Sequence, residues 1–313
     1  MRVLVTGAAN WQGSALVRRL AADGDVEHVV AVDTRRPPED LLAAVMVTHV
    51  DADVRSPGLA EVLRPHAPDV VVHNDVLQFA EPGRSARLLH DVNVMGTLQL
   101  LAACDGLPSL RTLVVKSSAS IYGSEPNAPA FFTEDMARKF PLRTRWQRDV
   151  SELENLVSAF ARRRPEVACT MLRMQPVLAP GLDTPIMNLL RSPLIPTWLG
   201  YDPRLQVLAG DDATGALWTA VRAAVRGPVN VAADGSVALS RVLQRLGRRS
   251  LPLAAPAFGP VTALAAKAGL PRMGPDTARY LRYGRGVDTT RMRADLGFAP
   301  ELTTIEAIEA VAR

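Results

Sequence analysis

Apolar residues in the first half of the chain come in short unbroken runs, separated by segments with helical periodicity. The runs predict six strands, at 2–6, 28–33, 45–50, 69–73, 113–117 and 167–173. Helical periodicity marks about 13–22, 85–104 and 145–161. Unbroken runs of β-branched residues are typical of strands buried on both faces, as in parallel sheets. Repeated strand–helix–strand units therefore predict an α/β fold with a Rossmann-type, doubly wound parallel sheet.

The pattern changes after Arg173. Prolines cluster at positions 176, 180, 185, 193, 196 and 203, which indicates a loop-rich insertion. A return strand is predicted at 205–208 with a helix at 211–224, and the tail from about Ser240 is predicted to be mostly helical. We therefore expect a dinucleotide-binding domain from 1–175 plus about 205–232. A smaller C-terminal substrate-binding lobe is expected from 176–204 and 233–313.

Composition narrows the class of protein. The chain has 313 residues, 48% hydrophobic and 22% charged, with a net charge of +4, which is ordinary for a globular protein. The start of the chain has no secretory leader, and the two cysteines form no metal or disulfide motif, so we expect a cytoplasmic protein without a metal site. No nucleic-acid motif accompanies the arginines. The apolar stretch 251–270 contains prolines and Lys267, so it predicts a loop and helix over a pocket rather than a stable membrane insertion.

A glycine-rich turn follows the first predicted strand. Gly7 and Gly13 flank Asn10, Trp11 and Gln12, where a helix begins and its free amides face outward. Such a helix start binds a diphosphate, and the glycines permit a tight turn and close packing.

The acidic residue of a dinucleotide site follows at the expected spacing. Asp33 ends the second strand, twenty residues after Gly13, where a carboxylate accepts the ribose hydroxyls. This predicts NAD, while Arg35 and Arg36 leave NADP open because an arginine can hold a 2′-phosphate.

Further motifs match one family together. Asp53-Val54 resembles a pair that meets the adenine, and the segment with His73, Asn74 and Asp75 resembles a cofactor-lining turn. Asn93 lies in N-V-x-G-T, and Ser118 and Tyr122 lie in S-S-x-x-[IV]-Y-G. Over nearly its whole length the chain resembles the extended short-chain dehydrogenases/reductases, the NAD-dependent epimerase/dehydratase family. It departs from the family pattern at Asn10, which replaces a glycine, and at Asp75, which replaces a small apolar residue.

The resemblance also implies a catalytic set that this chain carries only in part. Ser118 stands at the catalytic serine, although a serine at a strand end also acts as a backbone cap. Trp146 and Val150 stand at the family's Tyr and Lys, and no Tyr-x-x-x-Lys occurs anywhere in the chain. Indole and valine cannot transfer a proton, so the chain is predicted to be an atypical member.

Three other side chains are candidates for the missing chemistry. Tyr122 follows Ser118 closely, Lys116 shares a strand face with it, and Asp75 ends the neighbouring strand. An ion pair between Lys116 and Asp75 with a purely structural role is the alternative.

Three functions remain open from the sequence. The first is an oxidoreductase or epimerase acting on a nucleotide-sugar or similar alcohol, with Arg173, Arg191 or Arg204 as candidates for a diphosphate. The second is a non-catalytic NAD-binding sensor or scaffold. The third is a lipid or isoprenoid-alcohol dehydrogenase related to 3β-hydroxysteroid dehydrogenases. The resemblance further implies a homodimer built on the helices at 85–104 and 145–161.

Overall fold

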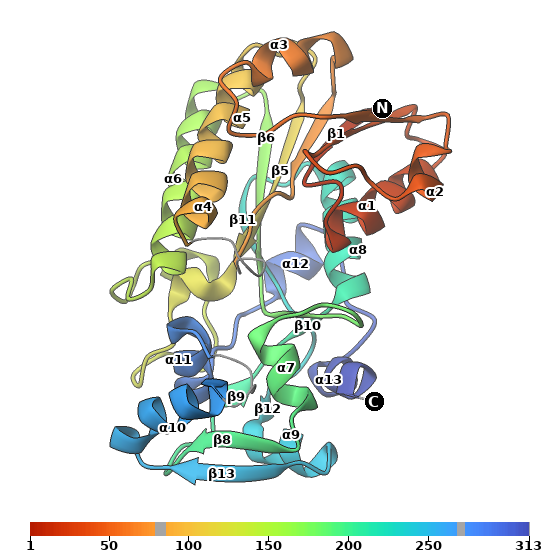
Figure 1. Ribbon diagram of the computed structural model, residues 1–313. Helices are drawn as coiled ribbons and strands as arrows, with labels where there is room; N and C mark the ends of the chain where they lie inside the picture. Colours follow the sequence, from red (N-terminus) through yellow and green to blue (C-terminus); the bar gives the residue numbers. More distant parts are fainter. Residues whose placement is uncertain (79–85, 268–272, 313) are drawn as a thin grey trace.

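The central sheet has seven strands, all parallel, in the spatial order β11-β6-β5-β4-β1-β2-β3 (Figure 1). The computed structural model describes residues 1–78, 86–267 and 273–312. The strands are β1 (Arg2–Thr6), β2 (His28–Val32), β3 (Val47–Val50), β4 (Val70–His73), β5 (Thr112–Ser118), β6 (Ala168–Met174) and β11 (Gly227–Val231). The predicted fold class is confirmed, and the strand order reverses between β1 and β4, where ligands bind in such sheets.

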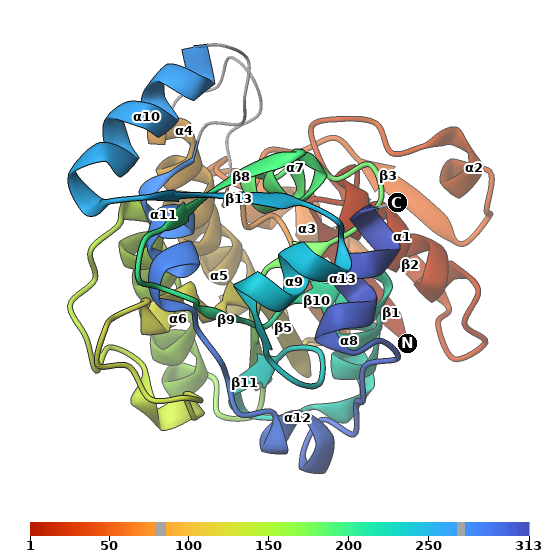
Figure 2. The same ribbon diagram turned by 90° about the horizontal axis from the view of Figure 1, so that it is seen from below.

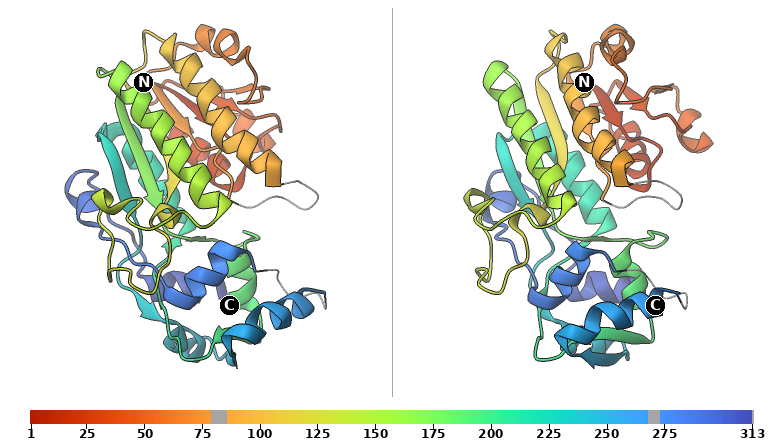
Figure 3. Two further views of the ribbon diagram at one scale, coloured as in Figure 1. Left: turned by 90° about the vertical axis from the view of Figure 1, so that its left-hand side faces the viewer. Right: turned by 60° about the vertical axis from the view of Figure 1, so that its left-hand side comes forward.

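Helices cover both faces of the sheet. On one face α1 (Trp11–Ala21) packs against α8 (Gly210–Ala223), with α2 (Glu39–Leu42) beside α1. On the other face lie α3 (Leu59–Leu63), α5 (Thr97–Asp105) and α6 (Arg145–Arg163), and Figure 3 shows α5 and α6 side by side. Two apolar cores result, one on each face. Alternate side chains of a strand enter opposite cores, as Val3 and Leu4 do.

The helix predicted at 85–104 contains a π-helical turn. It consists of α4 (Ala86–His90), a π segment (Asp91–Gly96) and α5, while residue 85 lies outside the described residues. π turns inside helices are frequent at functional sites, and this one carries Asn93.

A second lobe lies below the carboxyl ends of the strands (Figures 1 and 2). Its strands pair as β7 (Val177–Leu178) with β10 (Leu208–Ala209), β8 (Leu194–Trp198) with β13 (Arg249–Leu253), and β9 (Arg204–Leu205) with β12 (Val237–Ala238). Its helices are α7 (Pro185–Arg191), α9 (Leu239–Arg245), α10 (Ala255–Lys267), α11 (Pro275–Tyr283) and α13 (Thr304–Ala312). The short α12 (Thr290–Ala294) packs against β11 of the main sheet instead.

One sequence prediction for the second half is wrong, and another is confirmed. The strand that returns to the main sheet is β11, whereas 205–208 contributes only to the short strands β9 and β10 of the second lobe. The tail from Ser240 is mostly helical, as predicted, but it also contains β13, which pairs along β8. The stretch 251–270 forms the end of β13 and α10, and 268–270 lies outside the described residues. Within the described ranges, no helix combines the length and the apolar character that crossing a bilayer requires.

Candidate functional site

A cavity of about 290 Å³ opens between the carboxyl end of the sheet and the second lobe. The start of α1, the end of β5, the first turn of α6 and the α11 segment all contribute to it. The polar or ionisable side chains that line it include Gln12, Lys116, Ser118, Trp146, Asp276 and Arg285. The cavity therefore occupies the place where the reversal of strand order predicts a ligand.

The glycine turn between β1 and α1 needs its two glycines for different reasons. Gly7 has φ +65°, a conformation that residues with a Cβ rarely adopt. A Cβ on Gly13 would overlap the carbonyl oxygen of Gly7 and lie 2.9 Å from the Cα of Ala8. The first turn of α1 thus packs directly on the turn that precedes it.

Asn10 is accommodated where the family has glycine because its φ is −76°, which any residue adopts. Its Oδ1 accepts from the Gly13 amide at 2.8 Å, so Asn10 caps α1. Asn74 holds it in place by donating to Asn10 Oδ1 at 3.1 Å.

The amides of Trp11 and Gln12 are the free donors of this helix start. Among the described residues no acceptor meets either amide, and both residues line the cavity. Asp33 lies beside them, because its Oδ2 accepts from the Ala9 amide at 3.0 Å and its Oδ1 from the Arg35 amide at 2.8 Å. A helix start with free amides next to a fixed carboxylate fits a diphosphate with its attached ribose.

The remaining residues predicted for the cofactor are mostly engaged by protein groups. Asp53 forms a bidentate ion pair with Arg55, with Nε to Oδ1 at 2.9 Å, and Val54 is buried against Gly96. Asn93 accepts from the Leu77 amide and donates to the Leu77 carbonyl, both at 2.8 Å. This pairing fixes the chain after β4.

The side chain of His73 does not face a ligand. It is completely buried, and its ring bridges Thr6 Oγ1 at 2.8 Å and Thr97 Oγ1 at 2.9 Å. Burial lowers the pKa of His73 to about 3, with a smaller contribution from Lys116, so the ring is neutral. His73 ties β4 to β1 and α5, and its prediction as a cofactor-binding side chain is not supported by its position.

Lys116 and Asp75 lie near each other without forming an ion pair in the described part of the chain. Burial lowers the pKa of Lys116 to about 8, although the negative charge of Asp75 acts in the opposite direction. Burial also raises the pKa of Asp75 to about 6, and the neighbouring Asp33 adds to that shift. The predicted structural ion pair is therefore absent, and Lys116 faces the cavity.

The side chains of Ser118 and Tyr122 point in different directions, although the two residues are only four positions apart. Ser118 lines the cavity while its Oγ accepts from the Ser120 amide at 3.1 Å, so it is both a cap and a cavity residue. Tyr122 is buried, and its hydroxyl donates to Asn230 Oδ1 at 2.6 Å and accepts from Arg173 at 2.8 Å. Burial raises the pKa of Tyr122 to about 12. Tyr122 is therefore a core residue, which corrects its prediction as a proton donor in the cleft.

Arg173 belongs to the same buried network and not to the cavity. Its guanidinium forms a bidentate pair with Glu154 of α6, at 2.9 and 2.7 Å. Arg191 and Arg204 are exposed and do not line the cavity either. The three arginines proposed for a diphosphate are thus all placed elsewhere.

Comparison with known proteins identifies the family. Residues 3–232 match the model of the NAD-dependent epimerase/dehydratase family. The chain belongs to this family.

Two solved structures and one curated relative show how far the likeness extends. An uncharacterized protein of Mycobacterium tuberculosis is 40% identical over 310 residues, covering 98% of this chain and 82% of that protein. UDP-glucuronic acid 4-epimerase from Bacillus cereus, in complex with UDP-glucuronic acid and NAD, has a TM-score of 0.75 at 19% identity, covering 100% and 98% of the two chains. MoeE5 in complex with UDP-glucose and NAD has a TM-score of 0.71 at 25% identity, covering 100% and 97%.

In this epimerase/dehydratase family member, Trp146 and Val150 lie in the first turns of α6. Trp146 lines the cavity, and its indole nitrogen is buried without a partner among the described residues. Val150, one turn later, is buried in the apolar cluster around Tyr122 and does not reach the cavity.

Sequence reasoning missed Arg285 and Asp276. Arg285 is 4% exposed and lines the cavity, as does Asp276 at the start of α11. Burial raises the pKa of Asp276, although Arg285 acts against that shift. Neither residue lies in one of the family motifs, so no local sequence pattern pointed to either of them.

Trp11 connects the cofactor turn to the second lobe. Its indole ring lies so close to Gly210 that a Cβ there would overlap it, and the same Cβ would lie 2.7 Å from the Cβ of Ala179. The start of α1 is thus packed against the two segments that join the lobes.

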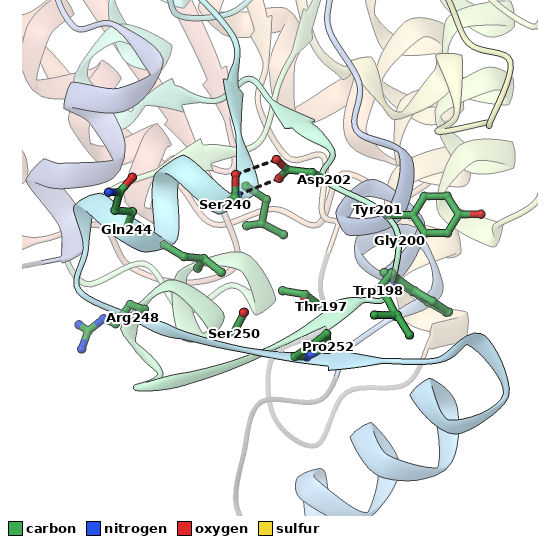
Figure 4. A pocket seen from close by; sticks show the side chains of 13 residues that line it. Thr197, Trp198, Gly200, Tyr201, Asp202, Ser240, Gln244, Arg248, Ser250 and Pro252 are labelled. Atoms are coloured by element: carbon green, nitrogen blue, oxygen red, sulfur yellow. Dashed lines mark hydrogen bonds between the residues drawn. The ribbon is translucent and has the colours of Figure 1, made fainter.

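A second cavity of about 430 Å³ lies within the second lobe, between the β8–β13 pair and α9 (Figure 4). Figure 4 shows Asp202 turned toward Ser240, which donates to it through both its amide at 2.8 Å and its hydroxyl at 2.7 Å. Pro252 lines this cavity, so part of 251–270 does border a pocket. None of the described residues of that stretch, 251–267, lines the cavity at the sheet.

Proposed function

We propose that this protein is an NAD-dependent oxidoreductase or epimerase that acts on a nucleotide-sugar or a similar alcohol. The observation that carries the proposal is the pair of unpartnered amides at Trp11 and Gln12, with Asp33 fixed beside them. The NAD and nucleotide-sugar found in the Bacillus cereus and MoeE5 structures support the same assignment.

In this proposal the diphosphate of NAD lies at the start of α1 and its adenosine ribose at Asp33. Bound NAD supplies a hydride acceptor for a substrate carbon. A carboxylate accepts both ribose hydroxyls but repels a 2′-phosphate, so Asp33 favours NAD over NADP. The Ala9 and Arg35 amides hold both oxygens of that carboxylate in place before the ribose arrives.

Lys116 and Ser118 are the groups of this chain assigned to the substrate oxygen. Ser118 Oγ accepts from a backbone amide and so keeps its proton available for donation. Lys116 has a pKa of about 8 because it is buried, so a proton can leave it or return to it near neutral pH. In this proposal Lys116 on β5 takes over the proton transfer that a tyrosine performs in the family.

A second candidate is a non-catalytic NAD-binding protein. It is favoured by Trp146 and Val150, which cannot transfer a proton, at the positions of the family's Tyr and Lys. The lipid-alcohol hypothesis loses support because the described part of that stretch, 251–267, does not line the cavity at the sheet.

Calorimetric titration with NAD and NADP tests the proposal. We expect NAD to bind with a dissociation constant in the micromolar range or below, and NADP more weakly. Binding of neither dinucleotide overturns both candidates. Lys116→Met separates them, since it abolishes turnover but not NAD binding in an enzyme, with the exposed Lys139→Met as the matched control.

A further inference from the structure

Exposed apolar side chains gather at one end of the second lobe. Leu194 of β8 is 43% exposed, Leu251 of β13 is 37% exposed and Leu264 of α10 is 69% exposed. Leu199 and Tyr201, which follow β8, are exposed to 61% and 40%. Figures 1 and 2 show β8, β13 and α10 together at the end of the molecule that lies farthest from the main sheet. Half of the large apolar side chains exposed in the described part of the chain therefore belong to this end.

The two strands expose their leucines because one face of the pair is only partly covered. Leu194 and Leu251 lie on this face, whereas the alternate residue Ile195 is completely buried in the core of the second lobe. The helix α10 covers the other end of the face, where Phe258 stacks on Trp198 with ring centroids 3.7 Å apart. Exposed apolar surface of this kind is typical of sites that bind a protein or a membrane.

The helix α10 extends the apolar surface without adding charge. No charged residue occurs from Ser250 to Ala266, and the first charge on α10 is at its last residue, Lys267. Its exposed side chains include Ala263 and Leu264. Such a helix can lie against the apolar part of a bilayer without burying a charge, which would be costly.

Positive charge is concentrated at the same end of the molecule. The segments 184–201 and 235–275, which contain β8, α9, β13 and α10, hold seven Lys or Arg residues and no Asp or Glu. The whole chain has a net charge of +4, so all the other residues together carry −3. Charge of one sign collected on one surface attracts a partner of the opposite sign.

Most of these basic side chains are available to such a partner. Arg245 pairs with Glu309 at 2.9 Å, and Arg272 lies outside the described residues. The other five are at least partly exposed and form no ion pair within the described ranges: Arg191, Arg241, Arg248, Arg249 and Lys267.

We propose that this end of the second lobe docks on the surface of a membrane that carries anionic lipids. The exposed leucines enter the boundary between headgroups and acyl chains, and the arginines attract the headgroup phosphates. Docking of this kind needs no helix that crosses the bilayer.

Other occupants fit the surface less well. A second copy of the chain would bring the same positive charges together across a two-fold interface. The leucines stand singly on two strands, a loop and a helix. A fluid lipid surface receives them without the shape complementarity that a protein interface needs. A nucleic acid matches the charge but gains little from exposed leucines.

Co-sedimentation of the full chain with vesicles tests the proposal. Vesicles of phosphatidylcholine are compared with vesicles of equal parts phosphatidylcholine and phosphatidylglycerol. Since each arginine near an anionic surface contributes about fivefold, we expect the partition coefficient to be larger by on the order of tenfold or more for the anionic vesicles. Added salt should weaken the binding, because it screens exposed charges. No binding to the anionic vesicles, or equal binding to both kinds, overturns the proposal.

Variants separate the two contributions to vesicle binding. Arg248→Gln combined with Arg249→Gln is expected to lower the partition coefficient by on the order of tenfold, and Leu264→Ser severalfold. The matched controls are Arg162→Gln, at an exposed arginine of α6, and Val45→Ser, at an exposed valine of the dinucleotide-binding domain. Both controls should bind vesicles as the natural protein does. Losses as large in the controls as in the variants would refute the assignment of this end.

Competition with a DNA duplex distinguishes a membrane from a general polyanion. We expect anionic vesicles to retain the protein when DNA is present at the same phosphate concentration. Complete displacement by DNA, together with unchanged vesicle binding by Leu264→Ser, would assign the surface to a polyanion and overturn the proposal. These measurements contain no NAD, so membrane docking and the proposed function can each fail without the other.

Discussion

At the scale of single residues, the direction of each side chain decides whether it reaches the cavity at the sheet. Lys116 and Ser118 face the cavity, while Ser117 of the same strand donates to Glu154 on the opposite face at 2.6 Å. Strand alternation made the shared face of Lys116 and Ser118 predictable from sequence. The direction of Tyr122 was not predictable, because a 3-10 turn (Ala119–Tyr122) follows the strand and ends the alternation.

Gly13→Ala is expected to abolish NAD binding and to destabilise the fold by about 1–3 kcal/mol, because the added methyl group overlaps the Gly7 carbonyl. Gly24→Ala is the matched control, since a Cβ at Gly24 meets no atom within 4 Å. Urea unfolding and NAD titration of both variants provide the check. Tight NAD binding by Gly13→Ala would contradict the assignment of this turn.

Lys116→Met is expected to be more stable than the natural protein at pH 7, by roughly 1–3 kcal/mol. The folded-state pKa of Lys116 is about 8, below its ordinary value of 10.5, because of burial. Between these two values the unfolded chain holds a proton that the folded chain has released, so stability rises with pH in that window. Below pH 8 the folded protein bears the full free-energy cost of burying the charged lysine, and a methionine at this position removes that cost.

Denaturant titrations from pH 7 to pH 10.5 test this sign. The gain in free energy of unfolding from Lys116→Met should shrink as the pH rises through that range. Lys139→Met should show no such trend with pH, because Lys139 is exposed. An advantage that is constant with pH would mean that the lysine is not desolvated.

At the scale of elements, the strands β1, β2 and β4 were predictable because each is dominated by an apolar run that is buried in the sheet. The edge strand β3 (VTHV) is only partly buried, and β5 and β6 also carry polar residues. The strand β11 (GPVNV) was missed, since it begins with glycine and proline and carries Asn230, which bonds to Tyr122 and Phe132. Residues 205–208 looked more like a strand but serve the second lobe. The strand β13 (RSLPL) was missed because its proline lowers strand propensity, which an edge position tolerates.

The pair between Arg173 on β6 and Glu154 on α6 joins two elements whose packing forms the core beneath the cavity. Arg173→Met leaves the Glu154 carboxylate buried and unpaired, and a loss of about 3–5 kcal/mol is expected. The double variant Arg173→Met with Glu154→Leu should recover most of that loss, because no buried charge remains. Urea unfolding of both variants measures the difference. An equal loss in both would assign the effect to packing.

At the scale of the whole molecule, the cavity is assembled from segments that are far apart in sequence. Gln12, Lys116, Trp146 and Arg285 come from both lobes. The first three lie in or beside family motifs and were predictable as site residues or as replacements of them. Arg285 was not, because its proximity depends on how the second lobe packs against the sheet, which local sequence does not encode.

A homodimer remains a prediction, and the exposed surface of the π segment and α5 is a candidate for its interface. Met95 and Leu98 are each 42% exposed and lie on one helix face with the exposed Ala102. Leu98→Glu is expected to convert a dimer into a monomer, whereas Leu199→Glu, exposed in the second lobe, should not. Size-exclusion chromatography with light scattering decides between these outcomes. A monomeric natural protein, or a Leu98→Glu dimer, would place any interface elsewhere.

The packing of Trp11 on Gly210 and Ala179 has a kinetic consequence. The backbone amide of Trp11 is one of the free donors at the start of α1. Its indole ring packs against the segments that lead into and out of the second lobe. A displacement of that amide when a dinucleotide binds would move the Trp11 ring against Gly210 and Ala179. We therefore expect compulsory-order kinetics, in which the dinucleotide enters first and the other reactant follows.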